Sequence, residues 1–215
     1  MKKSVLNILA LVAITITATG CKDDVKKAET QEAKEVKVMA SESSYDAIPA
    51  ESMISWKANK VVGGHEGTIN INKGKAKLKG DTLVGGTFVF DINTLKNTDI
   101  PAEDEGNAKL VGHLLSPDFF NAEAFPNATF EITTVVGNKV SGNLTLKGIK
   151  KNVTFNANVA VIGDDLTITS ETFTIDRTEW DIKYNSGKFV DPAKLGDYMI
   201  NDNIEIKISV KAKKA

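Results

Sequence analysis

Apolar and polar residues alternate along most of the chain after about residue 52. Segments such as 68–72 and 204–210 place an apolar side chain at every second position, which is typical of a strand with one buried face. Turn-forming residues separate these segments, for example Gly137-Asn138. The pattern predicts seven or eight antiparallel strands, and hence an all-β domain folded either as a sandwich or as a closed barrel.

Two irregularities interrupt the alternation. Gly85-Gly86 lies inside an otherwise apolar strand, which predicts a sharp bend or a close approach of another backbone. Further on, the apolar parity of residues 166–170 is out of step with that of residues 173–175. An extra residue near Glu171 would account for this shift, so we expect a β-bulge there.

One segment has helical rather than strand spacing. Residues 101–115 place Ala108, Val111 and Leu115 near one face, and acidic residues 103–105 lie where the dipole of a helix favours negative charge. The segment therefore predicts a single short helix after the early strands. His113, near its end, is expected to interact with the last turn of this helix.

An aromatic connector follows the helix. Residues 113–131 hold four of the nine phenylalanines, namely Phe119, Phe120, Phe125 and Phe130. Pro117 and Pro126 exclude both a continuous helix and a central strand, because each fixes the backbone and removes a hydrogen-bond donor. We expect a rigid connector that covers an apolar interior and leads into a strand beginning near Ala128.

The N-terminus has the pattern of an export signal. Two lysines precede an apolar stretch over residues 5–19, which is short for a membrane span. Ala18-Thr19-Gly20-Cys21 resembles a bacterial lipobox, in which the cysteine is acylated and becomes the new N-terminus. We therefore predict a lipoprotein signal over residues 1–20, lipidation of Cys21, and anchoring in the bacterial cell envelope at the outer membrane, facing the periplasm or the cell surface. The alternative is an ordinary signal, with Cys21 incidental.

The charged segment that follows predicts a tether. Residues 21–46 are rich in lysine and glutamate and poor in large apolar residues, so they are expected to be flexible. The folded domain is predicted to occupy residues 47–215. Lys22-Asp23-Asp24 resembles the export tag of some surface lipoproteins, although such charge runs usually only solubilise a chain.

Charge and composition exclude several functions. The net charge is -1, and removal of Lys2 and Lys3 with the signal leaves 25 basic and 28 acidic residues, or -3, so the domain offers no basic field to nucleic acid. A single cysteine excludes an internal disulfide and a cysteine-rich zinc site. No nucleophile motif of a serine hydrolase and no phosphate-binding loop is present. We therefore expect no enzyme activity and no cofactor.

A few polar residues are candidates for a site. His65 beside Glu66 provides too few ligands for a metal ion, so none is expected. Asp176, Arg177 and Glu179 could form a polar cluster near a ligand head group, or an ion pair that fixes the end of a strand.

Five motifs in register resemble the YceI-like family. They are Gly64-His-x-Gly67, His113-Leu-x-Ser-x-Asp-Phe-Phe120, Phe125-Pro-x-Ala-Thr-Phe-Glu131, Gly142-Asn-Leu-Thr-Leu-Lys-Gly-Ile-x-Lys-x-Val-Thr-Phe155 and Phe173-x-Ile-Asp-Arg177. The resemblance implies a lipocalin-like antiparallel barrel of eight strands with a capping helix. It also implies that a polyisoprenoid or another long-chain amphipathic lipid binds inside the barrel.

The resemblance also indicates which side chains would contact such a ligand. The expected apolar contacts are Trp56, Phe88, Phe90, Phe119, Phe120, Phe125, Phe130, Phe155 and Phe173, with His65, Asp176 and Arg177 as a polar rim. The alternative is that the aromatic residues only fill a core, which would make the protein a structural or interaction lipoprotein with a packed barrel. The expected partners are the lipid and, through Cys21, the membrane, with a homodimer as one possible association.

Overall fold

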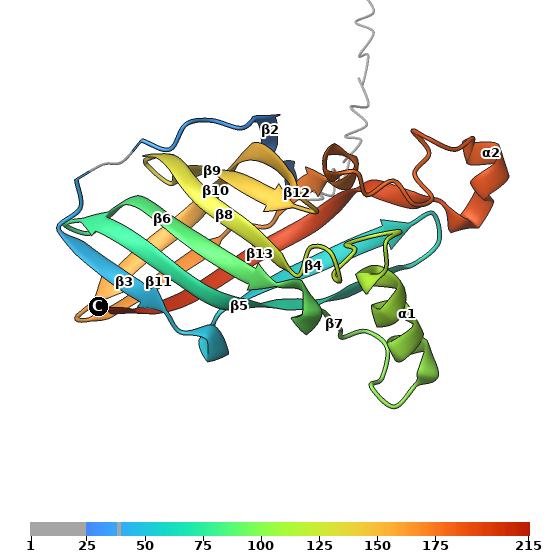
Figure 1. Cartoon of the computed structure of the whole chain (residues 1–215), viewed down its shortest axis with the longest axis horizontal. Coiled ribbons are helices and arrows are strands. Elements are labelled where there is room, and N and C mark those ends of the chain that lie inside the picture. The colour runs from blue at the N-terminus through green and yellow to red at the C-terminus, as the bar shows by residue number, and fades with distance from the viewer. Residues whose placement is uncertain (1–24, 38–39) are drawn as a thin grey trace, which may run out of the picture.

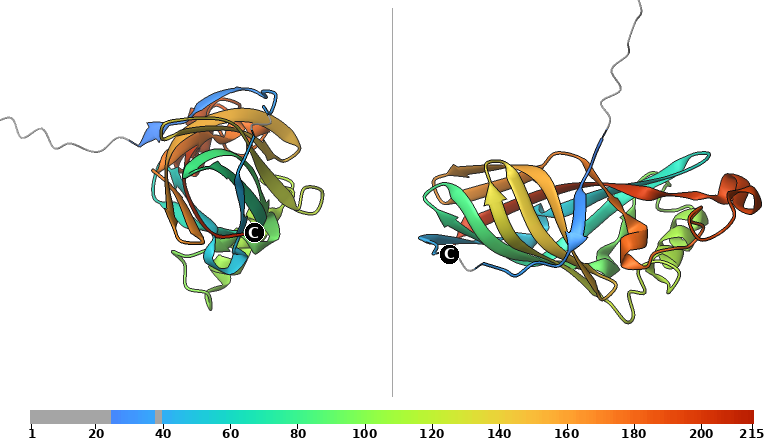
Figure 2. Two further views of the ribbon diagram at one scale, coloured as in Figure 1. Left: turned by 90° about the vertical axis from the view of Figure 1, so that its left-hand side faces the viewer. Right: turned by 90° about the horizontal axis from the view of Figure 1, so that it is seen from above.

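The computed structural model describes residues 25–37 and 40–215, and its main body is one antiparallel β-barrel (Figure 1). The end-on view in the left part of Figure 2 shows the strands as a ring. The ring contains β4 (Met53–Lys60), β5 (Gly64–Lys79), β6 (Thr82–Asp91), β8 (Asn127–Val136), β9 (Lys139–Leu146), β10 (Ile149–Ile162), β11 (Asp165–Ser170) and β13 (Ile200–Lys214).

Antiparallel pairing closes the ring. Neighbouring strands follow the order β5-β6-β8-β9-β10-β11-β13, and β13 then returns to β5 through β4. A further strand, β3 (Ser43–Ala47), continues β4 beyond the 3-10 turn Pro49–Glu51 and also pairs with both β5 and β13. This closure selects the barrel over the sandwich and confirms the predicted eight-stranded architecture.

The register brings one apolar side chain from each strand to the interior at every second position. Phe130 of β8, for example, pairs with Phe88 of β6 on one side and with Leu144 of β9 on the other. The ring of Phe130 lies over Gly142, where a Cβ atom would come within 2.3 Å of the ring. Gly142 therefore provides the space that this phenylalanine occupies.

Both predicted irregularities are confirmed. At Gly86 a Cβ atom would lie 2.7 Å from the carbonyl oxygen of Lys75, which is the close backbone approach. Between the pairs Thr169–Ser209 and Phe173–Ile206, one chain advances four residues and the other three. The extra residue separates β11 from β12 (Phe173–Asp176), which also pairs with β13.

Both α-helices lie at the end of the barrel opposite the C-terminus, here called the loop end (Figure 1). The predicted helix is α1 (Glu105–Leu115), and it begins later than the sequence indicated because the side chain of Asp104 caps it by accepting from the N–H of Gly106. The four-residue helix α2 (Pro192–Leu195) and the 3-10 turn Gly196–Tyr198 were not predicted. β13 begins at Ile200, earlier than expected.

Short strands complete the fold. β7 (Lys96–Asn97) pairs with β5, and 3-10 turns occupy Ile92–Thr94 and Arg177–Trp180. No helix among residues 25–37 and 40–215 is long and apolar enough to cross a membrane. The predicted signal over residues 1–20 and the predicted lipidation site Cys21 lie outside the described residues.

The prediction of a flexible tether over residues 21–46 is wrong for much of that segment. β1 (Lys26–Lys27) pairs in parallel with β12, and β2 (Glu29–Glu32) pairs in antiparallel with β10. Strands β10 and β12 do not pair with each other, so this segment fills the seam between them. β3, with Tyr45 buried, places the start of the barrel before residue 47.

We call residues 26–34 the strap. Ala28 is buried in the hydrophobic core, and the backbone of Lys34 both donates to and accepts from the side chain of Asn143, at 3.0 and 2.6 Å. Ion pairs join Lys27 to Asp176 (3.7 Å) and Lys151 to Glu32 (2.6 Å). The alternation of strap side chains is too short to be recognised in the sequence, which explains the wrong prediction.

Candidate functional site

The barrel contains an apolar cavity of about 120 Å³ in the half nearer the loop end. Strands, α1, the aromatic connector and the turn after β12 all contribute to its wall, and no polar atom is exposed to it. The main lining residues are Ile54, Trp56, Ile69, Phe90, Leu114, Phe119, Phe120, Phe130, Phe155, Phe173, Arg177, Ile182, Ile200, Ile204, Ile206 and Ile208. Such a surface can hold hydrocarbon but has nothing to offer a charged group.

A smaller cavity of about 30 Å³ lies beside the larger one. Phe90, Phe130, Phe155 and Ile208 line both spaces and so lie between them, and we call the three aromatic side chains the partition. The ring of Phe155 also stacks on that of Phe173, with centroids 4.4 Å apart and an interplanar angle of 2°.

The structure places the nine predicted aromatic residues in three positions. Seven line the larger cavity, namely Trp56, Phe90, Phe119, Phe120, Phe130, Phe155 and Phe173. Phe88 lines only the smaller one. Phe125 lines neither, because its ring packs against Gly148, where a Cβ atom would lie 2.8 Å from it. The prediction that Phe125 faces the interior is therefore not supported by its position.

The aromatic connector covers one end of the larger cavity. Its backbone folds back on α1, with the N–H of Phe120 donating to the carbonyl of Leu114 (3.1 Å) and that of Ala122 to Leu115 (2.9 Å). The Nζ atom of Lys147 donates to the carbonyls of Pro117 and Asp181, both at 3.1 Å. These bonds join the connector to two other segments and hold its phenylalanines in place.

His113 belongs to the outside of this cover. Its Nε2 atom lies 3.0 Å from a carboxylate oxygen of Asp118, and its ring stands edge-on to both Phe119 and Tyr184. The residue thus joins the connector to the loop after β12 as well as ending α1.

Arg177 closes the cavity at the loop end. Its side chain is buried and donates to the carbonyls of Ile182 (2.7 Å), Ile200 (3.1 Å) and Asn201 (3.2 Å). Burial lowers the pKa of Arg177, and the nearby carboxylates of Asp202 and Asp176 partly offset this effect. Because the guanidinium is already bonded to three carbonyls, Arg177 acts here as a cross-link between chain segments.

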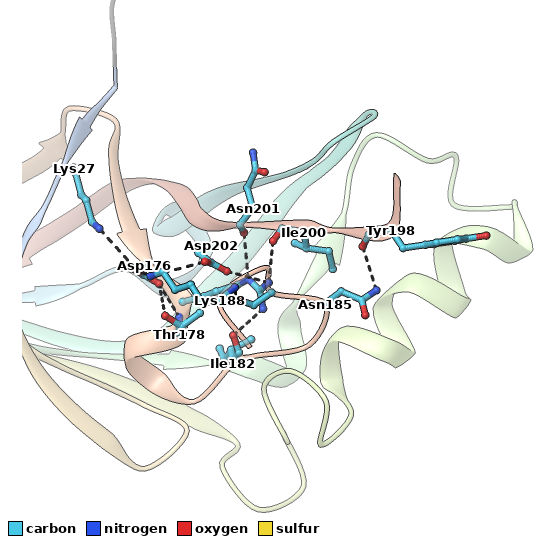
Figure 3. Close-up of polar contacts among 12 residues, drawn as sticks. Lys27, Asp176, Thr178, Ile182, Asn185, Lys188, Tyr198, Ile200, Asn201 and Asp202 are labelled. Atoms are coloured by element: carbon cyan, nitrogen blue, oxygen red, sulfur yellow. Dashed lines mark hydrogen bonds and ion pairs between the residues drawn. The ribbon is translucent and has the colours of Figure 1, made fainter. Parts of the chain in front are cut away.

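Asp176 contacts residues of three segments of the chain. It accepts from Lys188 and from the N–H and hydroxyl of Thr178 (3.0 and 2.6 Å), and it pairs with Lys27 of the strap (Figure 3). Burial tends to raise the pKa of Asp176, but the hydrogen bonds from Lys188 and Thr178 outweigh it and lower that pKa overall. The same contact raises the pKa of Lys188. The carboxylate therefore joins the strap to the loop end.

His65 belongs to a separate polar group. Its Nδ1 atom lies 2.9 Å from Asp99, which also accepts from the N–H of Glu66 and from the side chain of Asn97. Burial tends to raise the pKa of Asp99, but these hydrogen bonds lower it overall. His65 makes no hydrogen bond or ion pair with Asp176 or Arg177, so the predicted polar rim consists of two separately bonded groups.

Sequence reasoning missed the aliphatic half of the wall. β13 contributes Ile204, Ile206 and Ile208, and the loop after β12 contributes Ile182. The alternation in β13 could have identified the first three, whereas nothing in the sequence marks Ile182. Among residues 25–37 and 40–215, no three side chains of His, Cys, Asp or Glu are grouped as a metal site.

An eight-stranded antiparallel barrel with an apolar cavity defines a lipocalin-like protein. The family model described as YceI-like domain matches residues 45–212, and the chain belongs to this family. A UPF0312 protein of Staphylococcus aureus strain N315 is 34% identical over 149 residues, which are 62% of this chain and 86% of that protein.

Two solved structures share the fold. The crystal structure of BcnA from Burkholderia cenocepacia has a TM-score of 0.60 at 22% identity, covering 77% of this chain and 98% of that one. A polyisoprenoid binding domain from Saccharophagus degradans, implicated in plant cell wall breakdown, has a TM-score of 0.57 at 14% identity, covering 80% and 98%.

Proposed function

We propose that this protein binds the apolar tail of a long-chain isoprenoid or another amphipathic lipid inside the barrel, and that it carries or sequesters this lipid without chemical change. The observation that carries the proposal is the cavity, whose wall exposes only apolar atoms. Burial of hydrocarbon there gains roughly 25 cal/mol per Å² removed from water. The binding of a polyisoprenoid by a domain of the same fold supports the class of ligand.

The size of the cavity limits how such a lipid could enter. A volume of about 120 Å³ is close to the roughly 150 Å³ of an engineered cavity that binds benzene. A long tail therefore needs more room, and the partition of Phe90, Phe130 and Phe155 is the place where the smaller cavity could be added. We infer that ligand binding is coupled to rotation of these rings.

The same small volume favours a second candidate function. A barrel whose interior stays closed would serve as a structural or interaction lipoprotein that takes no ligand. The two candidates differ in whether the partition opens, which a binding experiment decides.

We also propose that Cys21 is acylated and that the protein is held at the outer membrane of a bacterial cell envelope. The apolar stretch over residues 5–19 and the lipobox-like Ala18-Thr19-Gly20-Cys21 support this placement. Multiple acyl chains anchor a protein stably, since each buried methylene contributes roughly 0.8 kcal/mol.

Native mass spectrometry of the protein purified from membranes tests the binding proposal. We expect a co-purifying lipid, and rebinding of a labelled isoprenoid or fatty amide after its removal. Ala58→Phe, which places a ring in the cavity, should reduce rebinding at least about tenfold because the added side chain occupies the ligand's space. Ala160→Phe is the matched control, since Ala160 is exposed on β10. A wild-type domain that stays empty and takes up neither probe would support the closed barrel.

A further inference from the structure

Exposed apolar side chains gather at the loop end of the barrel. We call this group the rim, and it consists of Val61, Val62, Tyr184, Phe189, Val190 and Tyr198. Phe189 is 53% exposed and Tyr198 is 76% exposed. Side chains of this kind are costly to leave in water, and a cluster of them rimmed by polar residues is typical of a surface that binds something.

Hydrogen bonds hold the rim together although its residues come from two parts of the chain. The N–H of Val61, in the β4–β5 turn, donates to the carbonyl of Met199 (3.2 Å). The side chain of Asn185 donates to the carbonyl of Tyr198 (3.1 Å), as Figure 3 shows. The Nζ atom of Lys183 lies 4.8 Å from the centre of the Phe189 ring. The rim is therefore a built surface rather than a set of unrelated side chains.

The rim lies at the end of the larger cavity. Ile182 and Ile200 line that cavity, and Tyr184 and Tyr198 follow or precede them by two residues. Tyr184 also contacts His113 and Phe119, which belong to the cover of the cavity. A lipid that left the cavity past Ile182 and Ile200 would meet the rim.

The path of the N-terminus indicates what the rim faces. The strap is fixed to the barrel from Lys26 onward, and Lys27 shares Asp176 with Lys188 of the loop that carries Phe189. Cys21 precedes Lys26 by five residues, a span of at most about 18 Å. If Cys21 is acylated, the bilayer lies within that distance of Lys26, and the neighbouring Lys27 is joined through Asp176 to the loop that carries Phe189.

We propose that the rim docks on the surface of a phospholipid bilayer and places the end of the cavity at the membrane. This inference rests on the proposed function, because the purpose of docking would be to let a lipid pass between the bilayer and the cavity. Residues 181–199 contain three lysines and three aspartates and so carry no net charge. Docking is therefore driven by burial of aromatic and aliphatic side chains in the interface, and it needs no anionic lipid.

Flotation with vesicles tests the proposal. The protein used is the chain from residue 21 with Cys21→Ser, which keeps every residue that the structure describes and removes the acyl anchor. We expect it to float with phosphatidylcholine vesicles, equally at low and high salt. Phe189→Ser combined with Tyr198→Ser should lower the bound fraction at least about tenfold, because the interfacial aromatic anchors are lost.

The matched control combines Val136→Ser with Ile162→Ser. These side chains are 70% and 79% exposed and belong to the last residues of β8 and β10, beside hairpin turns at the opposite end of the barrel. We expect this variant to float like the parent protein. An equal loss in both variants, or a parent protein that does not float, would overturn the proposal.

A second measurement reports which part of the protein surface contacts the bilayer. With Cys21 replaced, a single cysteine at Phe189→Cys or Ile162→Cys can carry an environment-sensitive fluorophore. We expect a blue shift on adding vesicles for the label at 189 and none for the label at 162. The reverse result, or no shift at either position, contradicts docking through the rim.

The two proposals fail separately. Lipid uptake is measured on the same proteins by native mass spectrometry in detergent, where no bilayer is present. Lipid uptake without flotation would contradict docking through the rim and would support the proposed function. Flotation without lipid uptake would support docking through the rim and would contradict the proposed function.

Discussion

At the scale of single residues, Phe120 and Phe125 share one connector but meet different surroundings. Phe120 lines the larger cavity, whereas Phe125 packs outside it against Gly148. The sequence places both in the same proline-bounded segment. The alternation of apolar and polar residues predicts the orientation of side chains in a strand, but not in a loop such as this one. Their different roles follow from where the connector folds back onto α1.

This difference can be tested with one substitution at two positions. Phe120→Asp should lower the free energy of unfolding by about 2 kcal/mol, since it removes apolar burial and adds a charge beside a dry cavity, and it should also abolish lipid retention. Phe125→Asp is the matched control and should destabilise the domain while retaining the lipid. Urea unfolding and native mass spectrometry measure the two effects. If Phe120→Asp lost stability alone in a domain shown to bind lipid, Phe120 would be core packing only.

Asp176 supports a prediction about acid. Because its pKa is lowered in the folded state, the ionised carboxylate stabilises the fold above the unfolded pKa of about 4, and this stabilisation is lost as the pH falls through the lower folded value. Asp176→Asn should therefore be less stable than the parent at pH 7 by about 2 kcal/mol. Its stability should then fall less steeply between about pH 5 and pH 2.

Urea unfolding at a series of pH values measures both quantities. Asp165→Asn is a suitable control because its partner Lys213 is exposed and the pair, 3.9 Å apart, joins the start of β11 to β13 near the C-terminus. Parallel pH profiles for the parent and Asp176→Asn would show that Asp176 does not stabilise the folded state as described.

At the scale of elements, the strap is the least expected part of the fold. Local propensity does not favour a strand over residues 26–32, which are charged and mostly exposed. The strand forms because β10 and β12 present unpaired backbone edges across the seam, and the chain that runs between them can satisfy both. Such a segment is determined by its partners rather than by its own sequence.

Ala28 is the strap residue whose substitution should most weaken the attachment of the strap to the barrel. Ala28→Asp buries an unpaired carboxylate in the core, so we expect the strap to leave the seam. Hydrogen exchange should then quicken at residues 26–32 and along the uncovered edges, residues 151–154 and 173–174. Gln31→Asp, on an exposed position of the strap, should leave exchange unchanged. Unchanged exchange in Ala28→Asp would show that the seam does not depend on the strap.

At the scale of the whole molecule, closure of the barrel determines what the interior can hold. Eight strands leave an interior just wide enough to be filled by side chains or to hold one small ligand. Here the interior is divided between side chains and two apolar spaces, separated by Phe90, Phe130, Phe155 and Ile208. The same ring of strands brings the rim and the cover of the cavity toward one end.

The sequence by itself determined the strands, the helix, the bulge near Glu171 and the close approach at Gly86, because each depends on the spacing of residues within a few positions. The motifs at Gly64, His113, Phe125, Gly142 and Phe173 determined the family, and with it the barrel. Only the tertiary structure decided which aromatic residues face the cavity, that Arg177 is bonded to carbonyls, and that residues 26–34 complete the wall. These features depend on contacts between segments far apart in the chain, and no local pattern records them.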